Sequence, residues 1–198
     1  MENLKVQNII LKEAEIIYIK DFLPLKQANE YFNILIKELK WEQHYIKIFG
    51  KTLAQPRLSA LYAENDDSYT YSGLTLQPLK FHHVLKDLQM KLAEVSETKF
   101  THCLANLYRD GSDSMGLHAD DERELGPNPV IASISLGASR KFKLKHREHK
   151  EDKMDLILEH GSLLLMQGST QHHWKHELPR TKKPVDPRIN LTFRKIIK

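Results

Sequence analysis

Hydrophobic residues recur at helical spacing in two segments of the first half of the chain. Residues 24–41 begin with a proline, which suits the first turn of a helix, and repeat apolar residues every three or four positions: Ala28, Phe32, Leu35, Ile36 and Leu39. Residues 78–97 follow the same rule with Val84, Leu88, Leu92 and Val95. Both patterns predict amphipathic helices that each pack one face against a core.

From residue 101 onward the pattern changes to short segments, often alternating between apolar and polar residues and bounded by Gly, Pro, Asn and Asp. These segments are residues 102–109, 114–119, 130–137, 140–146, 155–160, 162–167, 172–178 and 188–195, and an earlier strand is expected at 15–22. Short strands at this spacing favour a sandwich or barrel. We therefore predict a mostly β protein of the α+β class, with a double-sheet jelly roll covered on one side by the two helices.

Composition narrows the class of protein without naming a function. The chain has 198 residues, of which 40% are hydrophobic and 28% charged, so one globular domain is expected. Its net charge of +4 is compatible with a nucleic-acid partner but does not require one. Cys103 is the only cysteine, which excludes an internal disulfide and a cysteine zinc cluster, and its role is left open.

The sequence also carries expectations about location. No apolar run approaches the length of about 18 residues that a membrane span needs. The first residues mix acids into their apolar stretch and lack a small-residue cleavage site, so no signal peptide is expected. We therefore expect a cytoplasmic protein, or a nuclear one in a eukaryote, without a membrane partner.

Candidate metal ligands lie at two places in the second half of the chain. His118 and Asp120 are two residues apart, so in an extended segment both side chains project to the same side. This pair is weak evidence alone, because such spacings arise by chance. His172, His173 and His176 could supply a third ligand. Two histidines and one carboxylate form the facial triad of non-haem Fe(II) oxygenases, which leaves coordination positions open.

Residues 188–194 add a second chemical signal. On a strand, the polar residues Arg188, Asn190, Thr192 and Arg194 would share one face, and Ile189, Leu191 and Phe193 would share the other. Arginines that face inward require an anion, because a buried charge without a partner is costly. A dicarboxylate cosubstrate would supply a group that a guanidinium grips through two parallel hydrogen bonds.

Together these motifs resemble a known family. "LHADDE", "SLGASRKF", "HGSLLLMQG", "HHWKHELP" and "PRINLTFRK" are similar to the AlkB-type Fe(II)/2-oxoglutarate dioxygenases, especially the branch that acts on double-stranded DNA. The resemblance covers roughly residues 45 to 197. It implies that His118, Asp120 and His176 are the iron ligands, that His172 and His173 are outer or surface residues, and that the cosubstrate pocket contains Asn106, Tyr108, Arg188, Asn190, Thr192 and Arg194.

The activity implied by the resemblance is direct reversal of N-alkyl base lesions, of the 1-methyladenine and 3-methylcytosine type, in DNA that is preferably duplex. Such enzymes use Fe(II), O2 and 2-oxoglutarate and release succinate, CO2 and formaldehyde. Alternatives from the residues are the same chemistry on RNA or single strands, a nucleic-acid-binding module without a working metal site, and a protein hydroxylase. A monomer is expected, because binding to duplex DNA needs a free surface.

The resemblance also implies DNA-contacting residues. Phe49 stands where duplex-acting members carry an intercalating aromatic, and Tyr69, Tyr71 and Ser72 stand in the base-contacting stretch. Tyr71 departs from a phenylalanine that is common at this position, which leaves stacking possible but does not define the base preference. Glu122 would contact the edge of the flipped base, and Arg57 and the "RTKKP" loop would add to a basic surface. Lys141, Lys143, Lys145 and Arg147 alternate on a strand and would form a positive stripe that binds phosphates.

Within the single domain we expect three parts. Residues 1–43 would supply a supporting strand and helix, and residues 44–100 would form a nucleotide-recognition lid and the second helix. Residues 101–198 would form the catalytic jelly roll.

Overall fold

A computed structural model describes residues 5–48, 50–65, 69–71 and 74–197. Its largest element is an eight-stranded sheet with this spatial order: β1 (Val6–Leu11), β2 (Ala14–Ile19), β14 (Ser162–Gln167), β11 (Ile131–Gly137), β16 (Arg188–Arg194), β9 (His102–Tyr108), β5 (Leu58–Ala63) and β8 (Leu79–Lys80). All neighbours in this sheet are antiparallel except β5 and β8, which are parallel.

A second, four-stranded sheet has the order β10 (Met115–His118), β15 (Trp174–Leu178), β12 (Arg140–His146) and β13 (Lys153–Leu158). Two separate hairpins are formed by β3 (Tyr45–Ile48) with β4 (Lys51–Ala54), and by β6 (Tyr69–Tyr71) with β7 (Leu74–Leu76). The helices are α1 (Leu25–Glu38), α2 (His83–Ser96), the short α3 (Thr170–His173) and one 3-10 turn at Arg123–Leu125.

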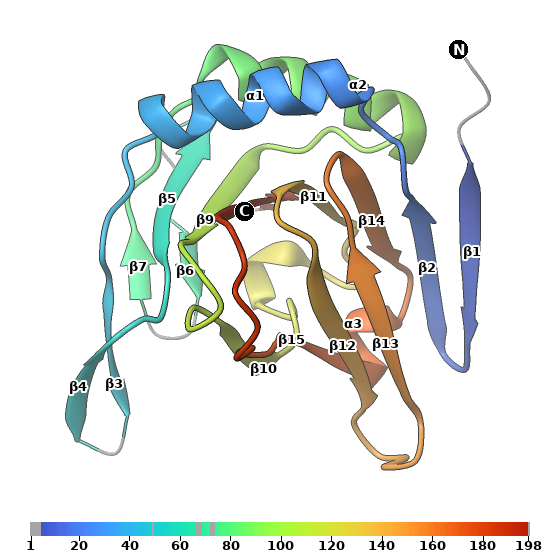
Figure 1. The fold of residues 1–198 in the computed structure, drawn as a ribbon. Coiled ribbons are helices and arrows are strands. Elements are labelled where there is room, and N and C mark those ends of the chain that lie inside the picture. The colour runs from blue at the N-terminus through green and yellow to red at the C-terminus, as the bar shows by residue number, and fades with distance from the viewer. Residues whose placement is uncertain (1–4, 49, 66–68, 72–73, 198) are drawn as a thin grey trace.

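Helices α1 and α2 cover one face of the eight-stranded sheet (Figure 1). Their apolar stripes are buried as their spacing predicts, with Ala28, Leu35, Leu88 and Leu92 wholly inaccessible to solvent. Burying these stripes removes apolar area from water, which is the main favourable term in forming this layer.

The opposite face of the large sheet packs against the small sheet. Ile131 and Leu164 from the large sheet share a buried cluster with Leu144 and Trp174 from the small sheet. This second core lies between the sheets, so the chain forms two β layers with a helical layer outside. The predicted fold, a mostly β jelly-roll core with supporting helices, is confirmed.

The structure differs from the sequence pattern at one helix boundary and in one additional strand. The second helix begins at His83 rather than near residue 78, because residues 79–80 pair with β5 and the His82 ring accepts a hydrogen bond from the Val84 N–H as an N-cap. Strand β1, which the pattern did not single out, pairs with β2 at the edge of the large sheet. That sheet therefore takes strands from all three parts of the expected division.

In the described part of the chain, no helix has the length and apolar character needed to cross a membrane.

Candidate iron and cosubstrate site

His118 and His176 are direct cross-strand neighbours between β10 and β15. Their ring centroids are 4.3 Å apart, and Nε2 of His118 lies 3.8 Å from Oδ1 of Asp120, which follows the end of β10. One potential ligand atom from each of the three residues lies within 4.8 Å of the others. The structure thus brings together the predicted triad. Of the three candidate histidines, His172, His173 and His176, it is His176 that lies beside His118 and Asp120.

The hydrogen bonds of His118 prepare one ring nitrogen for a metal. Its Nδ1 lies 2.9 Å from the carbonyl oxygen of Gly116, which can only accept, so Nδ1 carries the proton. The lone pair of Nε2 is therefore directed toward Asp120 and His176. A backbone carbonyl that fixes the tautomer in this way is a common feature of metal-binding histidines.

Two other His and carboxylate groups in the described residues have the opposite arrangement. His146 Nδ1 accepts the N–H groups of Glu148 and His149, so its Nε2 carries the proton and donates to Glu13. His82 Nδ1 accepts the Val84 N–H in the same way, and Nε2 donates to Glu38. In this arrangement His146 and His82 act as hydrogen-bond donors to the two carboxylates, in contrast to His118, whose Nε2 faces the other two candidate ligands.

Asp120 is held as a buried carboxylate. It is 2% exposed, and Arg194 Nη2 donates to its Oδ1 over 2.8 Å. Burial alone would raise the pKa of Asp120, but Arg194 and the two histidines lower it to about 2. The backbone N–H of Asp120 donates to Oε1 of the fully buried Gln171, which fixes the loop that carries the ligand.

His176 is buried and packed against the ring of Phe142, with centroids 5.2 Å apart. Burial, with a further contribution from His118, lowers the pKa of His176 to about 3. The imidazole is therefore neutral at physiological pH, which is the form that binds a metal.

Arg188 lies at the other end of the same cavity and is 1% exposed. Its Nη2 donates to Ser135 Oγ over 2.8 Å, and its guanidinium lies 5.3 Å from the centroid of the Tyr108 ring. Its Nε and Nη1 are buried and make no hydrogen bond with the described residues. Burial lowers the pKa of Arg188 to about 10, so the group stays charged at neutral pH. Buried donors of this kind fit a carboxylate ligand.

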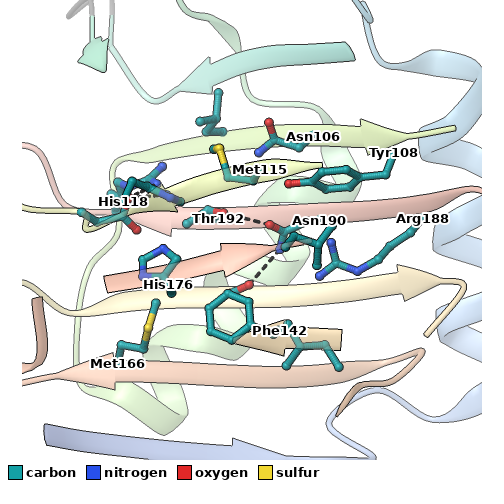
Figure 2. Close-up of a pocket in the computed structure, with 16 residues that line it drawn as sticks. Asn106, Tyr108, Met115, His118, Phe142, Met166, His176, Arg188, Asn190 and Thr192 are labelled. Atoms are coloured by element: carbon teal, nitrogen blue, oxygen red, sulfur yellow. Dashed lines mark hydrogen bonds and ion pairs between the residues drawn. The ribbon is translucent and has the colours of Figure 1, made fainter. Parts of the chain in front are cut away.

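The three predicted ligands and the six predicted cosubstrate residues line one cavity between the two sheets (Figure 2). Asn190 and Thr192 bond within the strand layer, since Asn190 Nδ2 donates to Ser133 Oγ and Thr192 Oγ1 to Asn190 Oδ1. The donor set at one end fits Fe(II), and the arginine at the other end fits the far carboxylate of 2-oxoglutarate. The sequence reading omitted the other wall residues: Leu104, Met115, Ser133, Phe142, Leu158, Met166 and Leu178.

The predicted DNA contacts are only partly described. Phe49 and Ser72 lie outside the described residues, and for Tyr69 and Tyr71 only the backbone of β6 is described. Glu122 is half-buried and lies just before the 3-10 turn, where its carbonyl accepts the Leu125 N–H. It follows Asp120 by two residues, so it lies on the loop that carries this candidate ligand.

The expected surface position of Arg57 is wrong. Arg57 is 4% exposed, and its Nε donates to Asn106 Oδ1 over 2.9 Å. The reason is that β5 pairs with β9, which brings Arg57, the residue directly before β5, to Asn106 on β9. Arg57 therefore contributes no exposed charge.

The expected basic stripe is largely neutralised. Lys141 pairs with Asp155 and Lys145 with Glu177, while Arg147 pairs with Asp121. Lys143 shares a groove beside β12 with the basic residues Arg180 and Lys183 from the loop after β15. This basic groove is lined by Ser139, Arg140, Lys141, Lys143, Ile157, Pro179, Arg180, Thr181, Lys183 and Val185.

Comparison with known proteins agrees with this geometry. The model of the 2OG-Fe(II) oxygenase superfamily matches residues 15–194. The chain belongs to this superfamily, whose members use Fe(II), 2-oxoglutarate and O2.

Its relatives define the branch more narrowly as AlkB-type. The chain is 40% identical to mouse "DNA oxidative demethylase ALKBH2" over 90% of its own length and 74% of the relative, and 41% identical to the human protein over 86% and 69%. It is also 40% identical to bovine "Alpha-ketoglutarate-dependent dioxygenase alkB homolog 3" over 88% and 64%. A solved structure, "The structure of OsALKBH1", shares the fold with a TM-score of 0.69 at 19% identity, covering 94% of this chain and 100% of the other.

Proposed function

We propose that this chain is an AlkB-type DNA oxidative demethylase that removes N-alkyl groups from damaged bases such as 1-methyladenine and 3-methylcytosine. The observation that carries the proposal is the pairing, in one cavity, of the His118, Asp120 and His176 triad with the buried Arg188. The relatives named as DNA oxidative demethylases support DNA as the substrate.

Bound Fe(II) and 2-oxoglutarate, with O2, would supply the oxidation of the N-methyl group on a damaged base, and the oxidised group would leave as formaldehyde. The chain's own residues bind and orient. His118, Asp120 and His176 would hold the metal, and Arg188 with Asn106 and Tyr108 would hold the dicarboxylate. Phe142, Leu158 and Leu178 supply apolar wall that limits access of water to the cavity.

We further propose that duplex DNA is favoured and that the β3–β4 hairpin enters it. Figure 1 shows this hairpin extending away from the sheets. Tyr45 and Leu53 expose 59% and 46% of their surface on it, so the hairpin offers apolar side chains to a partner. Phe49 lies between the two strands in sequence and would fill the gap left when a damaged base leaves the stack. Tyr69, Tyr71, Ser72 and Glu122 would hold the flipped base.

The basic groove is the proposed phosphate-binding surface. Lys143, Arg180 and Lys183 carry its charge together with Lys141, whose charge is shared with Asp155. Contacts to phosphates would supply affinity without sequence preference and would weaken as salt rises. Such a complex requires one free copy of the chain, which is why we propose a monomer.

The test is release of formaldehyde from oligonucleotides that carry one 1-methyladenine or 3-methylcytosine, as duplex DNA, single-stranded DNA and RNA. The proposal expects release from DNA, fastest on the duplex, and none from the unmethylated oligonucleotide. Phe49→Ala should reduce release from duplex more than from single strands. Release from RNA or single strands alone would overturn the duplex preference, and no release from any substrate would overturn the demethylase assignment.

A further inference from the structure

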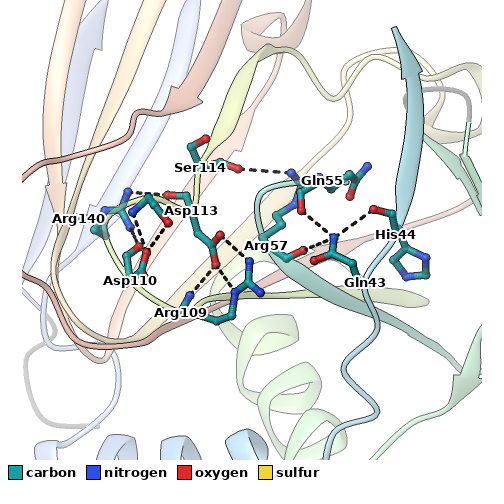
Figure 3. A network of polar contacts seen from close by, with 10 residues as sticks. Gln43, His44, Gln55, Arg57, Arg109, Asp110, Asp113, Ser114 and Arg140 are labelled. Atoms are coloured by element: carbon teal, nitrogen blue, oxygen red, sulfur yellow. Dashed lines mark hydrogen bonds and ion pairs between the residues drawn. The ribbon is translucent and has the colours of Figure 1, made fainter. Parts of the chain in front are cut away.

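The base of the β3–β4 hairpin is joined to the cavity wall by a set of polar contacts (Figure 3). The side-chain amide of Gln43 donates to three carbonyl groups, those of His44 at 3.1 Å, Gln55 at 2.7 Å and Arg57 at 3.4 Å. His44 and Gln55 are the residues on either side of the hairpin, and they also bond to each other through the Gln55 N–H. Gln43 therefore joins both ends of the hairpin to Arg57.

Arg57 continues this connection into the cavity wall. Its Nε donates to Asn106 Oδ1 at 2.9 Å, and its Nη1 contacts the Ser114 carbonyl at 3.4 Å. The Ser114 N–H donates to the carbonyl of Pro56, so residues 56 and 57 bond to both polar groups of the Ser114 backbone. Ser114 directly precedes β10, the strand that ends in His118.

The bond from Arg57 decides which end of the Asn106 amide faces the ligand. An amide has one oxygen that accepts and one nitrogen that donates. Because Oδ1 is used by Arg57, the NH2 group is left for the cavity, and Figure 2 shows the amide nitrogen on the cavity side. A donor in this position attracts a carboxylate, whereas the reversed amide would present an oxygen and repel it.

We propose that Arg57 is a positioning residue that fixes the Asn106 amide for 2-oxoglutarate, and that Gln43 couples this position to the β3–β4 hairpin. DNA held by the hairpin would then strengthen binding of the cosubstrate at the opposite end of the connection. This inference rests on the proposed function, in which Asn106 contacts 2-oxoglutarate and the hairpin contacts DNA. It gives Arg57 a role in the cosubstrate site in place of a direct DNA contact.

The first test measures 2-oxoglutarate affinity by anaerobic titration of the Fe(II)-loaded protein, without turnover. Arg57→Met removes the donor but keeps an unbranched side chain, and should weaken 2-oxoglutarate binding about tenfold, as expected for a lost hydrogen bond to a group that contacts an anion. Arg109→Met is the control, since Arg109 pairs with Asp113 in the neighbouring contacts and is not among the described partners of the Asn106 side chain. It should bind 2-oxoglutarate like the parent.

A double-variant cycle separates positioning from general destabilisation. If Arg57 acts through Asn106, then Arg57→Met combined with Asn106→Ala should bind no more weakly than Asn106→Ala alone. Losses that multiply would overturn the inference, as would parental affinity in Arg57→Met. If Arg57→Met does not fold, Arg57→Lys keeps the buried charge without the guanidinium fork, and the same cycle applies. If Asn106→Ala itself binds normally, the assignment of Asn106 to the cosubstrate pocket fails first, and the inference with it.

The second test addresses coupling to the hairpin. Unmethylated duplex DNA, which cannot react, should strengthen 2-oxoglutarate binding by the parent protein, and Gln43→Leu should reduce that gain while leaving affinity without DNA near the parental value. A parent protein that shows no gain, or a gain that persists unchanged in Gln43→Leu, would overturn the coupling.

Discussion

Arg194 donates a hydrogen bond of 2.8 Å to Asp120, and both side chains are almost wholly buried. The arginine lies on β16 and the carboxylate on the loop after β10, so the bond links the large sheet to this loop. Its charge is the main influence that lowers the pKa of Asp120 against the effect of burial. The strand that was predicted to bind the cosubstrate thus also positions Asp120, a proposed iron ligand.

Replacing this arginine should weaken the metal site. Arg194→Met leaves the buried Asp120 without its cationic partner, so its pKa should rise and its carboxylate should lose its fixed orientation. Residues that support metal ligands from outside typically contribute ten- to hundredfold in metal affinity, so we expect a loss of about that size. Anaerobic Fe(II) titration against a competing chelator measures it, and an unchanged affinity would show that Asp120 needs no partner.

Arg188 should decide affinity for the cosubstrate without affecting the metal. Arg188→Met removes two buried donors that have no other hydrogen-bond partner in the described chain, and should weaken 2-oxoglutarate binding about a hundredfold. Arg188→Lys keeps the charge but lacks the forked guanidinium, so its 2-oxoglutarate affinity should lie between those of the parent and Arg188→Met. Fe(II) affinity without 2-oxoglutarate serves as the control. Equal 2-oxoglutarate affinity in all three proteins would place the anion elsewhere.

Stability should fall in mild acid because of His160. Its Nδ1 accepts the Gly137 N–H at 2.8 Å, and burial lowers its pKa below the usual value of about 6.5. A histidine with a lowered folded-state pKa contributes stability that is present above pH of about 6.5 and is lost as pH falls through the folded-state value. The unfolding free energy of His160→Gln should therefore fall less than that of the parent when the pH is lowered from 7 into the acid range. Denaturant titrations at each pH measure this difference. An identical pH dependence would exclude this group.

The contact of α2 with the large sheet should carry much of the stability. Leu88→Ala opens a cavity at a position with 0% exposure and should cost about 2–5 kcal/mol of unfolding free energy. Met90→Ala, on the same helix but 61% exposed, should change it by less than about 0.5 kcal/mol. Chemical denaturation of both variants gives the comparison, and similar losses would contradict the assignment of faces on α2.

The sequence predicted the parts of the site that depend on local periodicity. Arg188 and Arg194 face the cavity because strand residues alternate, and the neighbouring Ile189 and Phe193 are buried on the other face. His176 could be chosen over His172 and His173 only through the family resemblance, because the residues alone left all three open. Its pairing with His118 across β10 and β15 gives the physical reason.

Contacts between distant segments were not predictable from the sequence. Arg57 looked like a surface cation, but pairing of β5 with β9 carries it beneath the hairpin to Asn106, 49 residues away. Lys145 looked like part of a positive stripe, but pairing of β12 with β15 brings Glu177 within 3.0 Å. No sequence pattern predicts the contact of Gln171, because its bond to the Asp120 backbone depends on how the short helix α3 packs. For Arg57 and Lys145 strand order decides the partner, and for Gln171 the packing of α3 does; a single sequence reveals neither.

We expect His118, Asp120 and His176 together to hold Fe(II) beside an anion site at Arg188. The decisive experiment is anaerobic titration of the protein with Fe(II) and 2-oxoglutarate, following the weak visible charge-transfer band of the chelate. We predict that the band develops with the parent protein and is lost in His176→Ala, while His172→Ala retains it. Absence of the band in the parent, or its survival in His176→Ala, would contradict the assignment.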